Sequence, residues 1–383
     1  MSFSLQRDRQ LLNSALTRRT LLASALLAGC SRQLATRYFG WLFIAGAAER
    51  CLAVADLSQF RHVTTIPLEH VPGQVLRAGE RLFVTCPDAR ILLEIDLGGF
   101  KPGRKLALPG RIVSAAVKPD GKWIVAVTEQ PALICLIDPV SLRVKKQTPL
   151  SSAPAVLDLT DTMAVVAAAA GDSITRVALG NNGACNVVGR TAAGARCGVI
   201  RFRKDGRQIL CGLPEARQIV TLDAGTGVLL ARMPLAFAPA SFSYNPDGGQ
   251  MFVTGASDDT LAIVNPYQNE VDQTIIAGRT PFGMAVSLTR NLLLLTNPGS
   301  GDLTILDIDT RRLSASVHIG GNPGEVLLTP DEEYALVIGR DSGDVSVVRL
   351  RTVLDRSVKT KPLFTVFPMA ANPQSAVIVP RAG

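Results

Sequence analysis

The stretch Pro246-Asp247-Gly248 has the composition of a tight turn, and related triplets recur along the chain. Proline fixes the first turn angle, aspartate bonds its own backbone, and glycine accepts a positive φ. The related triplets are Pro119-Asp120-Gly121, Lys204-Asp205-Gly206 and Pro330-Asp331-Glu332. In chain order the four aspartates lie 85, 42 and 84 positions apart. These separations are two, one and two steps of a repeat of about 42 residues.

A second marker has the same period. Apolar, strand-like runs end in an aspartate at Asp96, Asp138, Asp223 and Asp307, with separations of 42, 85 and 84 positions. Two independent markers with one period indicate radial repetition of a single unit, and short strands with turns at such intervals are typical of four-stranded blades. The sequence therefore predicts an all-β fold, a β-propeller, with no helix longer than about two turns after residue 40.

Eight blades are predicted, with seven as the alternative. Residues 41–67 supply only the second, third and outer strands of a blade, and residues 373–380 supply only an inner strand. If these segments share one blade, the two chain ends close the ring and remove its open sheet edges. The unit at 153–190 has the weakest markers, and the count falls to seven if it is not a blade. Inner strands are expected to begin near Pro72, Arg111, Ala153, Arg196, Pro239, Pro281, Pro323 and Pro373.

Three stretches resemble the YVTN β-propeller repeat: 252–265, 295–307 and 317–331, the last reading Val317-His318-Ile319-Gly320-Gly321-Asn322-Pro323-Gly324-Glu325 at its start. The resemblance extends over residues 41–383 and implies the propeller fold. It also implies kinship with exported proteins of unknown ligand and with relatives of lactonases that open sugar lactones. Propellers that carry haem or quinone-type redox centres have a similar repeat, but they need additional side chains as ligands of the redox centre.

The N-terminus has the pattern of an export signal. Residues 1–20 are polar and basic, and Arg18-Arg19 resembles a twin-arginine signal, although the following residues match that pattern only in part. The apolar run at 21–29 is too short to cross a bilayer, which needs roughly 20 residues. We therefore expect residues 1–30 to be an export signal, 31–40 a tether and 41–383 the propeller.

Leu27-Ala28-Gly29-Cys30 resembles a bacterial lipobox, at the end of the apolar run. The resemblance implies that Cys30 is lipidated and becomes the first residue of the mature chain. The expected location is then the periplasm or cell envelope, with a lipid anchor in the membrane. A plain signal peptide with an incidental cysteine and an uncleaved membrane anchor remain as alternatives.

Composition excludes several other classes of partner. The formal net charge is +8, but the first 40 residues carry six arginines and one acidic residue, so the rest of the chain is nearly balanced and predicts no nucleic-acid binding. Six cysteines follow Cys30 without a Cys-x-x-Cys pair, and the chain has three histidines, so neither a metal site nor a bound cofactor is expected. Most of these cysteines are expected in the core, with one candidate disulfide between Cys185 and Cys197.

A candidate ligand face follows from the repeat. Arg50, Arg90 and Arg217 each lie six positions before a strand-ending aspartate, in the loop between second and third strands. The loops that lead from outer to inner strands should meet the same face, and they offer His70, Arg111, Arg196, Arg279 and Asn322. An arginine-rich face suits an anionic or carboxylated ligand, because guanidinium offers a rigid fork of donors.

The competing interpretation is that these arginines form solvated ion pairs with the acids just upstream, which are Glu49, Asp88 and Glu215. His62 and His318 fall in predicted outer strands, away from the axis. The sequence thus lacks a recognisable catalytic constellation.

The leading functional hypothesis is an exported envelope propeller that binds a small anionic ligand or an envelope protein without catalysis. One alternative is a lactonase-type hydrolase, for which Glu49, Glu215 and Asp258 are the nearest candidate acids or bases. The other is a redox or cofactor-maturation propeller, since twin-arginine export carries folded proteins.

Overall fold

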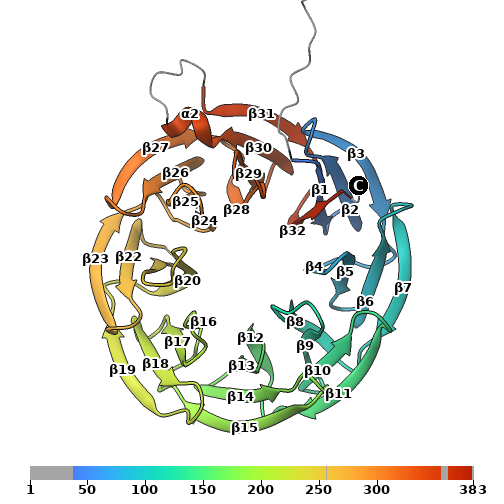
Figure 1. Ribbon diagram of the computed structural model, residues 1–383, viewed down its shortest axis with the longest axis vertical. Coiled ribbons are helices and arrows are strands. Elements are labelled where there is room, and N and C mark those ends of the chain that lie inside the picture. Colours follow the sequence, from blue (N-terminus) through green and yellow to red (C-terminus); the bar gives the residue numbers. More distant parts are fainter. Residues whose placement is uncertain (1–37, 256, 355–360, 382–383) are drawn as a thin grey trace, which may run out of the picture.

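The computed structural model describes residues 38–255, 257–354 and 361–381. Its strands form eight four-stranded antiparallel sheets arranged as the blades of a ring (Figure 1). The predicted fold and the count of eight blades are therefore confirmed. In seven blades the strands follow one another in chain order from an inner strand near the axis to an outer strand on the rim, and in the blade that holds both chain ends the inner strand is the last strand of the chain.

The first four blades carry half of the strands. Blade 1 contains β32 (Pro373–Pro380), β1 (Gly40–Gly46), β2 (Cys51–Asp56) and β3 (Arg61–Pro67). Blade 2 contains β4 (Val75–Ala78), β5 (Arg81–Cys86), β6 (Ile91–Asp96) and β7 (Lys101–Ala107). Blade 3 contains β8 (Arg111–Val117), β9 (Ile124–Glu129), β10 (Leu133–Asp138) and β11 (Arg143–Pro149). Blade 4 contains β12 (Pro154–Leu159), β13 (Met163–Ala168), β14 (Ser173–Leu179) and β15 (Cys185–Ala192).

The other four blades follow the same plan. Blade 5 contains β16 (Val199–Phe202), β17 (Gln208–Leu213), β18 (Gln218–Asp223) and β19 (Leu229–Pro234). Blade 6 contains β20 (Pro239–Tyr244), β21 (Met251–Gly255), β22 (Thr260–Asn265) and β23 (Glu270–Ile276). Blade 7 contains β24 (Met284–Ser287), β25 (Leu292–Asn297), β26 (Asp302–Asp307) and β27 (Arg312–His318). Blade 8 contains β28 (Pro323–Leu328), β29 (Tyr334–Gly339), β30 (Asp344–Arg349) and β31 (Leu363–Pro368), with the short helix α2 (Leu350–Leu354) between its last two strands.

The ring closes as the sequence predicts. β32 pairs antiparallel with β1, from Gly40 opposite Pro380 to Gly46 opposite Pro373, so the two ends of the chain share blade 1. The weakly marked unit at 153–190 forms the complete blade 4. No helix of the described residues is long and apolar enough to cross a membrane.

Three inner strands begin about three residues later than expected, at Val75, Val199 and Met284 instead of Pro72, Arg196 and Pro281. In blade 7 the reason is a threonine. The Thr296 hydroxyl accepts a hydrogen bond from the backbone N–H of Gly283 (2.8 Å), where a regular ladder would use a backbone carbonyl. Thr85 does the same for Gln74 in blade 2 (2.8 Å). The segment that leads into the inner strand is thus hydrogen-bonded to the second strand. Because these bonds do not follow the regular β-ladder, the inner strand begins later than expected.

Both sequence markers are turns in which an aspartate side chain bonds the backbone just ahead of it. In the first-to-second turns, Asp120 accepts from the N–H of Lys122 (3.0 Å) and Asp247 from that of Gly249 (2.6 Å). In the third-to-fourth turns, Asp307 accepts from the N–H of Thr310 (2.8 Å). The period therefore reflects the local chemistry of two turns that every blade needs.

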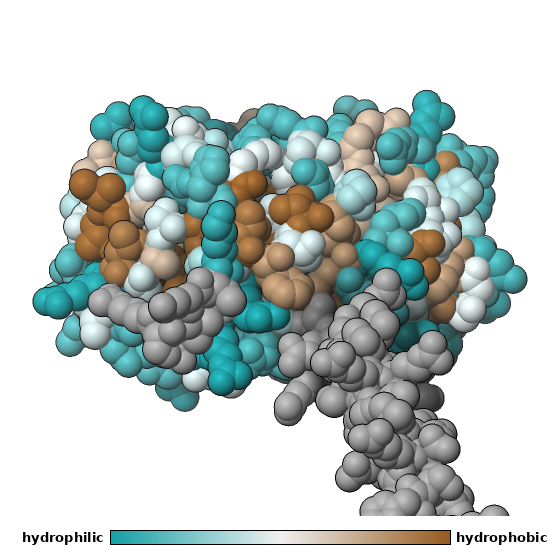
Figure 2. Space-filling view, turned by 90° about the horizontal axis from the view of Figure 1, so that it is seen from above, coloured by the Kyte–Doolittle hydropathy of each residue, from teal (hydrophilic) through white to brown (hydrophobic). Residues whose placement is uncertain are grey.

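The core is a ring of eight apolar clusters, and each cluster joins two neighbouring blades. The cluster that closes the ring contains Leu42 and Ile44 of β1 with Leu336 of β29 and Val345 of β30, all buried. Second and third strands are buried on both faces, whereas outer strands such as β27 and β31 are largely exposed. Figure 2 views the ring edge-on and shows apolar side chains on this outer wall between more polar edges.

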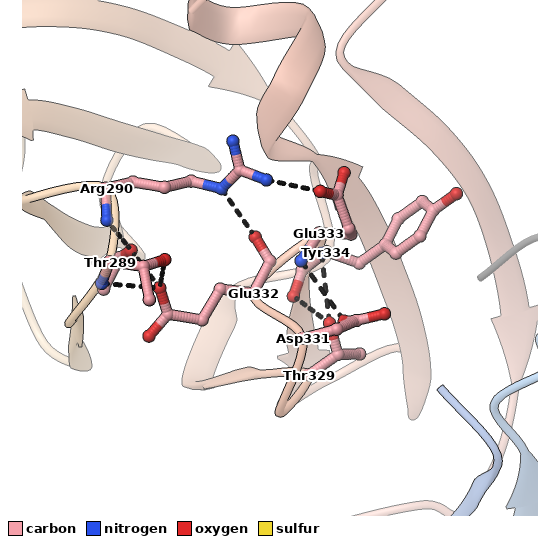
Figure 3. A network of polar contacts seen from close by, with 8 residues as sticks. Thr289, Arg290, Thr329, Asp331, Glu332, Glu333 and Tyr334 are labelled. Atoms are coloured by element: carbon pink, nitrogen blue, oxygen red, sulfur yellow. Dashed lines mark hydrogen bonds and ion pairs between the residues drawn. The ribbon is translucent and has the colours of Figure 1, made fainter. Parts of the chain in front are cut away.

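Blade 8 departs from the turn pattern at Glu332, which occupies the glycine position of the Pro-Asp-Gly turn with φ of 51°. Its carboxylate reaches blade 7 and accepts hydrogen bonds from the Ser287 hydroxyl (2.6 Å), the N–H of Leu288 (2.8 Å), and the N–H (2.9 Å) and hydroxyl of Thr289. Figure 3 shows the part of this network that joins Thr289 to Glu332, together with the bond from Arg290 to the Glu332 carbonyl (3.0 Å). A strained residue is therefore retained where its side chain links two blades.

The six cysteines among the described residues are buried free thiols, so the expected disulfide between Cys185 and Cys197 is wrong. The two residues belong to different core clusters, Cys185 between blades 3 and 4 and Cys197 between blades 4 and 5. Burial raises the pKa of Cys51 and Cys86 to about 11 and that of Cys135 to about 12.

These thiols should therefore be unreactive in the folded protein. We expect a Cys30→Ser chain to show no rapid reaction with a maleimide at pH 8, because the thiolate is both shielded and disfavoured. After unfolding in guanidinium without reductant, six thiols should react, as counted by mass spectrometry. A count of four would mean that two of them are oxidised to a disulfide.

Candidate functional site

The two faces of the ring carry different loops. Inner strands begin at one face, which we call the entry face, and it carries the outer-to-inner loops and the second-to-third turns. The opposite face carries the first-to-second and third-to-fourth turns. Because β1 is a second strand, the described chain begins at this opposite face, which we call the tether face.

The repeated arginines Arg50, Arg90 and Arg217 all lie on the entry face and are exposed. Each is the left-handed residue of its turn, with φ of 50°, 60° and 47°, and its carbonyl accepts a hydrogen bond (2.7 Å) from the leucine that follows the outer strand. Blades 7 and 8 place Gly301 and Gly343 at this point, with φ of 71° and 68°. The repeat position is therefore defined by backbone geometry, which glycine satisfies as well as arginine does.

The acids near these arginines have other partners. Asp88 accepts from Arg111 (2.8 Å) instead of Arg90, and Glu215 from Arg196 (3.2 Å) instead of Arg217. Glu49 accepts from the thiol of Cys51 (3.5 Å). Among the described residues, Arg50, Arg90 and Arg217 have no carboxylate partner. The ion pairs expected between each of these arginines and the acid just upstream of it are therefore wrong.

In blades 3, 5 and 8 the outer-to-inner loop is held by a similar contact within the blade. Arg111 donates to Glu129 (3.1 Å), Arg196 to Glu215, and Asn322 to Asp341 (3.0 Å), so that the residue entering the blade bonds its second-to-third turn. These side chains are at least partly exposed, and such pairs each contribute roughly 0–1 kcal/mol. Arg279 is exposed on the neighbouring loop of blade 7.

His70 lies half-buried between blades 1 and 2, with its Nε2 3.8 Å from Glu69. It borders a separate cavity of about 240 Å³ that Lys105 and Cys86 also line. His62 bonds Thr65 (2.9 Å) and His318 bonds Asp302 (2.9 Å), both on outer strands as expected. Among the described residues, no group of three histidine, cysteine or acidic side chains is placed to hold a metal ion.

Two cavities border the axis near the entry face, of about 640 and 320 Å³. They share five lining residues, Phe282, Glu325, Arg340, Gln374 and Ser375, and we call the first four the channel site. The residues come from blades 7, 8 and 1, whose inner strands β24, β28 and β32 lie side by side in Figure 1. None of the eight residues predicted from sequence lines either cavity, although Asn322 bonds Asp341, which does.

Glycines let blades 7 and 8 approach closely at this point. A Cβ atom on Gly283 would lie 2.4 Å from the carbonyl oxygen of Gly324, and that oxygen accepts a hydrogen bond from the Thr296 hydroxyl (2.7 Å). Close approach of two inner strands brings Phe282 and Glu325, which each directly neighbour one of these glycines, to the same cavity. The sequence produces the site through small residues that carry no chemistry themselves.

Arg340 supplies a positive charge that no acid of the described residues neutralises. Its guanidinium carbon lies 4.8 Å from the centre of the Phe282 ring, and its stem passes over Gly324, where a Cβ would lie 2.6 Å from the arginine Cγ. Phe282 remains 50% exposed. The cation–π contact therefore orients the guanidinium while leaving its donors available to a ligand.

Glu325 is a solvent-exposed residue of the channel, although the protein of the ring surrounds the region of its carboxyl group. Burial raises the pKa of Glu325 to about 7, an effect that the hydrogen bond from the N–H of Ala376 (3.1 Å) only partly offsets. Thr254 lines the larger cavity, and its buried hydroxyl has no hydrogen-bond partner among the described residues. The cavity therefore offers a cation, an aromatic face and an acid that titrates near neutrality.

Sequence reasoning missed these residues for identifiable reasons. Glu325 follows a Gly-rich entry in the best YVTN-like stretch, but it stands alone in its repeat position. Arg340 begins the turn that ends at Gly343, whereas the predicted arginines stand at the turn's left-handed end. The two charged side chains of the channel site each occur in a single blade. The sequence prediction instead relied on an arginine that several blades repeat.

No family model and no curated protein matches the chain, so the YVTN resemblance stays a prediction. Solved structures do match. Dihydro-heme d1 dehydrogenase NirN, in complex with DHE, has a TM-score of 0.74 at 15% identity, over 92% of this chain and 78% of that chain. A putative 6-phosphogluconolactonase from Bacteroides fragilis has a TM-score of 0.58 at 17% identity, over 80% and 97% of the two chains. Hydrazine synthase from Kuenenia stuttgartiensis has a TM-score of 0.54 at 17% identity, over 73% and 95%. At these identities the likeness shows the propeller fold.

The acids expected for a lactonase do not converge on the cavities. Glu49 and Glu215 lie in turns outside both linings, and Asp258 only approaches Gly255, which lines the larger cavity. The one carboxylate of the linings that lies on an inner strand is Glu325.

Proposed function

We propose that this protein binds a small carboxylate-bearing ligand at the channel site and holds it without chemical conversion. The observation that supports the proposal is the unpaired Arg340 guanidinium, fixed over Phe282 in a cavity of about 640 Å³. Cavities that bind small molecules measure about 300–1,000 Å³ and combine an apolar lining with a few placed polar groups. A flat ligand would stack beside the Phe282–Arg340 pair and direct a carboxylate to the guanidinium.

Binding should depend on pH through Glu325. Below pH 7 this side chain is mostly protonated and neutral, and above pH 7 it is an anion in the same cavity as the ligand. Affinity for a carboxylate should therefore fall as pH rises from 6 to 8, by about fivefold, the effect of roughly 1 kcal/mol. Titration calorimetry with benzoate, gluconate and protoporphyrin IX at both pH values measures it.

The matched variant is Glu325→Gln, which keeps the shape and removes the titration. It should bind with a nearly constant affinity from pH 6 to 8, close to the parent value at pH 6. If the variant keeps the parent's full pH dependence, another group is responsible and Glu325 does not face the ligand. Hydrolysis of gluconolactone above the spontaneous rate would replace the binding proposal with the hydrolase alternative.

A second candidate ligand is a tetrapyrrole, in line with the cofactor-maturation hypothesis and with the structural likeness to NirN. The site fits the periphery of such a ligand, because Phe282 offers a ring face and Arg340 a carboxylate partner. It fits a permanently ligated haem less well, because neither cavity has a histidine in its lining and Met284 is the one soft donor there. Protoporphyrin IX and its iron complex should therefore bind alike, as compared by absorbance titration.

We also propose that the protein works in the bacterial envelope, anchored through Cys30. The sequence Leu27-Ala28-Gly29-Cys30 supports this, and it lies outside the described residues. Cys30→Ser should shift nearly all of the protein from the membrane fraction to the soluble envelope fraction, as seen by immunoblotting. A variant that fractionates like the parent would remove the lipid anchor from the account.

A further inference from the structure

The tether face carries most of the exposed apolar turn residues of the ring. They are Val140, Val228, Tyr267 and Leu288 in the turns of blades 3, 5, 6 and 7, and Phe39 just before β1. Leu288 is 66% exposed and Phe39 is 52% exposed. The entry-face loops expose two large apolar residues, Val71 and Phe282, and the second belongs to the channel site.

Arginines stack on aromatic rings around the same face. Arg203 lies 4.4 Å from the ring centre of Tyr267, Arg381 lies 4.7 Å from that of Trp41, and Arg349 lies 4.4 Å from that of Phe364. Aromatic rings with long basic side chains are typical of the interface between water and lipid headgroups, where the ring is half-immersed and the charge stays hydrated.

Several basic side chains of the tether face near the start of β1 are available to a partner. Arg61, Arg351 and Arg381 have no carboxylate partner among the described residues, whereas Glu333 is paired with Arg290 (2.5 Å) and Asp56 with the hydroxyl of Ser58 (2.6 Å). Basic residues held near an anionic membrane surface are attracted to it, and this attraction falls off within a Debye length. The sector around the start of β1 is therefore both basic and aromatic.

We propose that the tether face docks on the anionic lipid surface to which the chain is anchored, so that the channel site faces away from the membrane. The proposal rests on the envelope anchor proposed above. Cys30 precedes Tyr38 by eight residues, which span at most about 29 Å. A surface held within that distance has a high effective concentration at the bilayer, so weak contacts suffice to orient it. Orientation leaves the cavity open to soluble ligands or partners.

The test uses the chain from Cys30 onward, coupled through that thiol to a maleimide lipid. Coupling is selective because the other six cysteines are buried, and it makes the test independent of lipidation in the cell. The vesicles contain phosphatidylglycerol and phosphatidylethanolamine with brominated acyl chains, which quench nearby tryptophan. Single reporters replace the native tryptophans in a Trp41→Phe, Trp123→Phe background: Tyr267→Trp on the tether face and Val71→Trp on the entry face.

We expect the Tyr267→Trp reporter to be quenched at least threefold more than the Val71→Trp reporter. Adding Val140→Asp and Leu288→Asp should abolish the difference while the protein stays coupled, and neutral vesicles should reduce it. Equal quenching of the two reporters, or none, would overturn the proposal and leave the face to a protein partner or to water. Ligand titration on the same vesicles checks the channel site separately, because none of these substitutions touches its residues.

Discussion

Arg340→Ala is expected to weaken the binding of a carboxylated ligand by about 10–100-fold. A charge-assisted hydrogen bond contributes about 1.5–3 kcal/mol, and no other unpaired cation lines the two cavities. The loss should appear in the dissociation constant from calorimetry with the tightest member of the ligand panel at pH 6. The thermal stability of the free protein should hardly change, because Arg340 is exposed and forms no ion pair among the described residues.

The matched control is Arg90→Ala. Arg90 is also an exposed arginine of a second-to-third turn on the entry face and has no carboxylate partner among the described residues, but it lies outside both cavities. Its replacement should leave the affinity within twofold of the parent. If Arg90→Ala weakens binding as much as Arg340→Ala does, the ligand is held by the general field of the face and the channel site is wrong.

Glu332→Ala is expected to lower the free energy of unfolding by about 2–4 kcal/mol, the range for a buried polar network left with unsatisfied donors. Four hydrogen bonds from blade 7 would lose their acceptor, and the left-handed backbone would remain (Figure 3). Urea unfolding at pH 7 measures the loss.

Glu332→Gly and acid separate the two contributions. Glycine relieves the strained φ, so this variant should lose about 1 kcal/mol less than the alanine variant. Burial acts to raise the pKa of Glu332, but hydrogen bonds from Ser287 and Thr289 outweigh it and leave the pKa below its usual value. The carboxylate therefore stabilises the fold above the unfolded pKa, and this contribution is lost as pH falls through the folded value. A difference between parent and alanine variant that stays constant down to pH 2 would contradict the role of its charge.

The fold could be predicted because its signal is local and repeated. Asp120, Asp247 and Asp307 each bond the backbone of their own turn, so the sequence around them carries the whole instruction for that turn. The closure of the ring could also be predicted from the sequence, since residues 41–67 lack an inner strand that residues 373–380 provide. The late start of β24 could not be read, because it depends on the hydroxyl of Thr296, a side chain 13 residues away.

The candidate site was predicted less well, because repetition is a poor guide to it. Arg50, Arg90 and Arg217 recur because a left-handed turn position recurs, and the turn uses their backbone. Phe282 and Glu325 meet through the close approach of Gly283 and Gly324 from adjacent blades, a relation that no single repeat contains. The predicted roles of His70, Arg111, Arg196, Arg279 and Asn322 in ligand binding stay predictions.

The most direct measurement of the channel site is a crystal structure of the protein soaked with the carboxylate of the panel that binds most tightly at pH 6. We predict ligand density in the cavity between Phe282 and Glu325, with a carboxylate oxygen about 3 Å from the Arg340 guanidinium. Density over the turns of Arg50, Arg90 and Arg217 with an empty cavity would contradict the account and restore the arginine face.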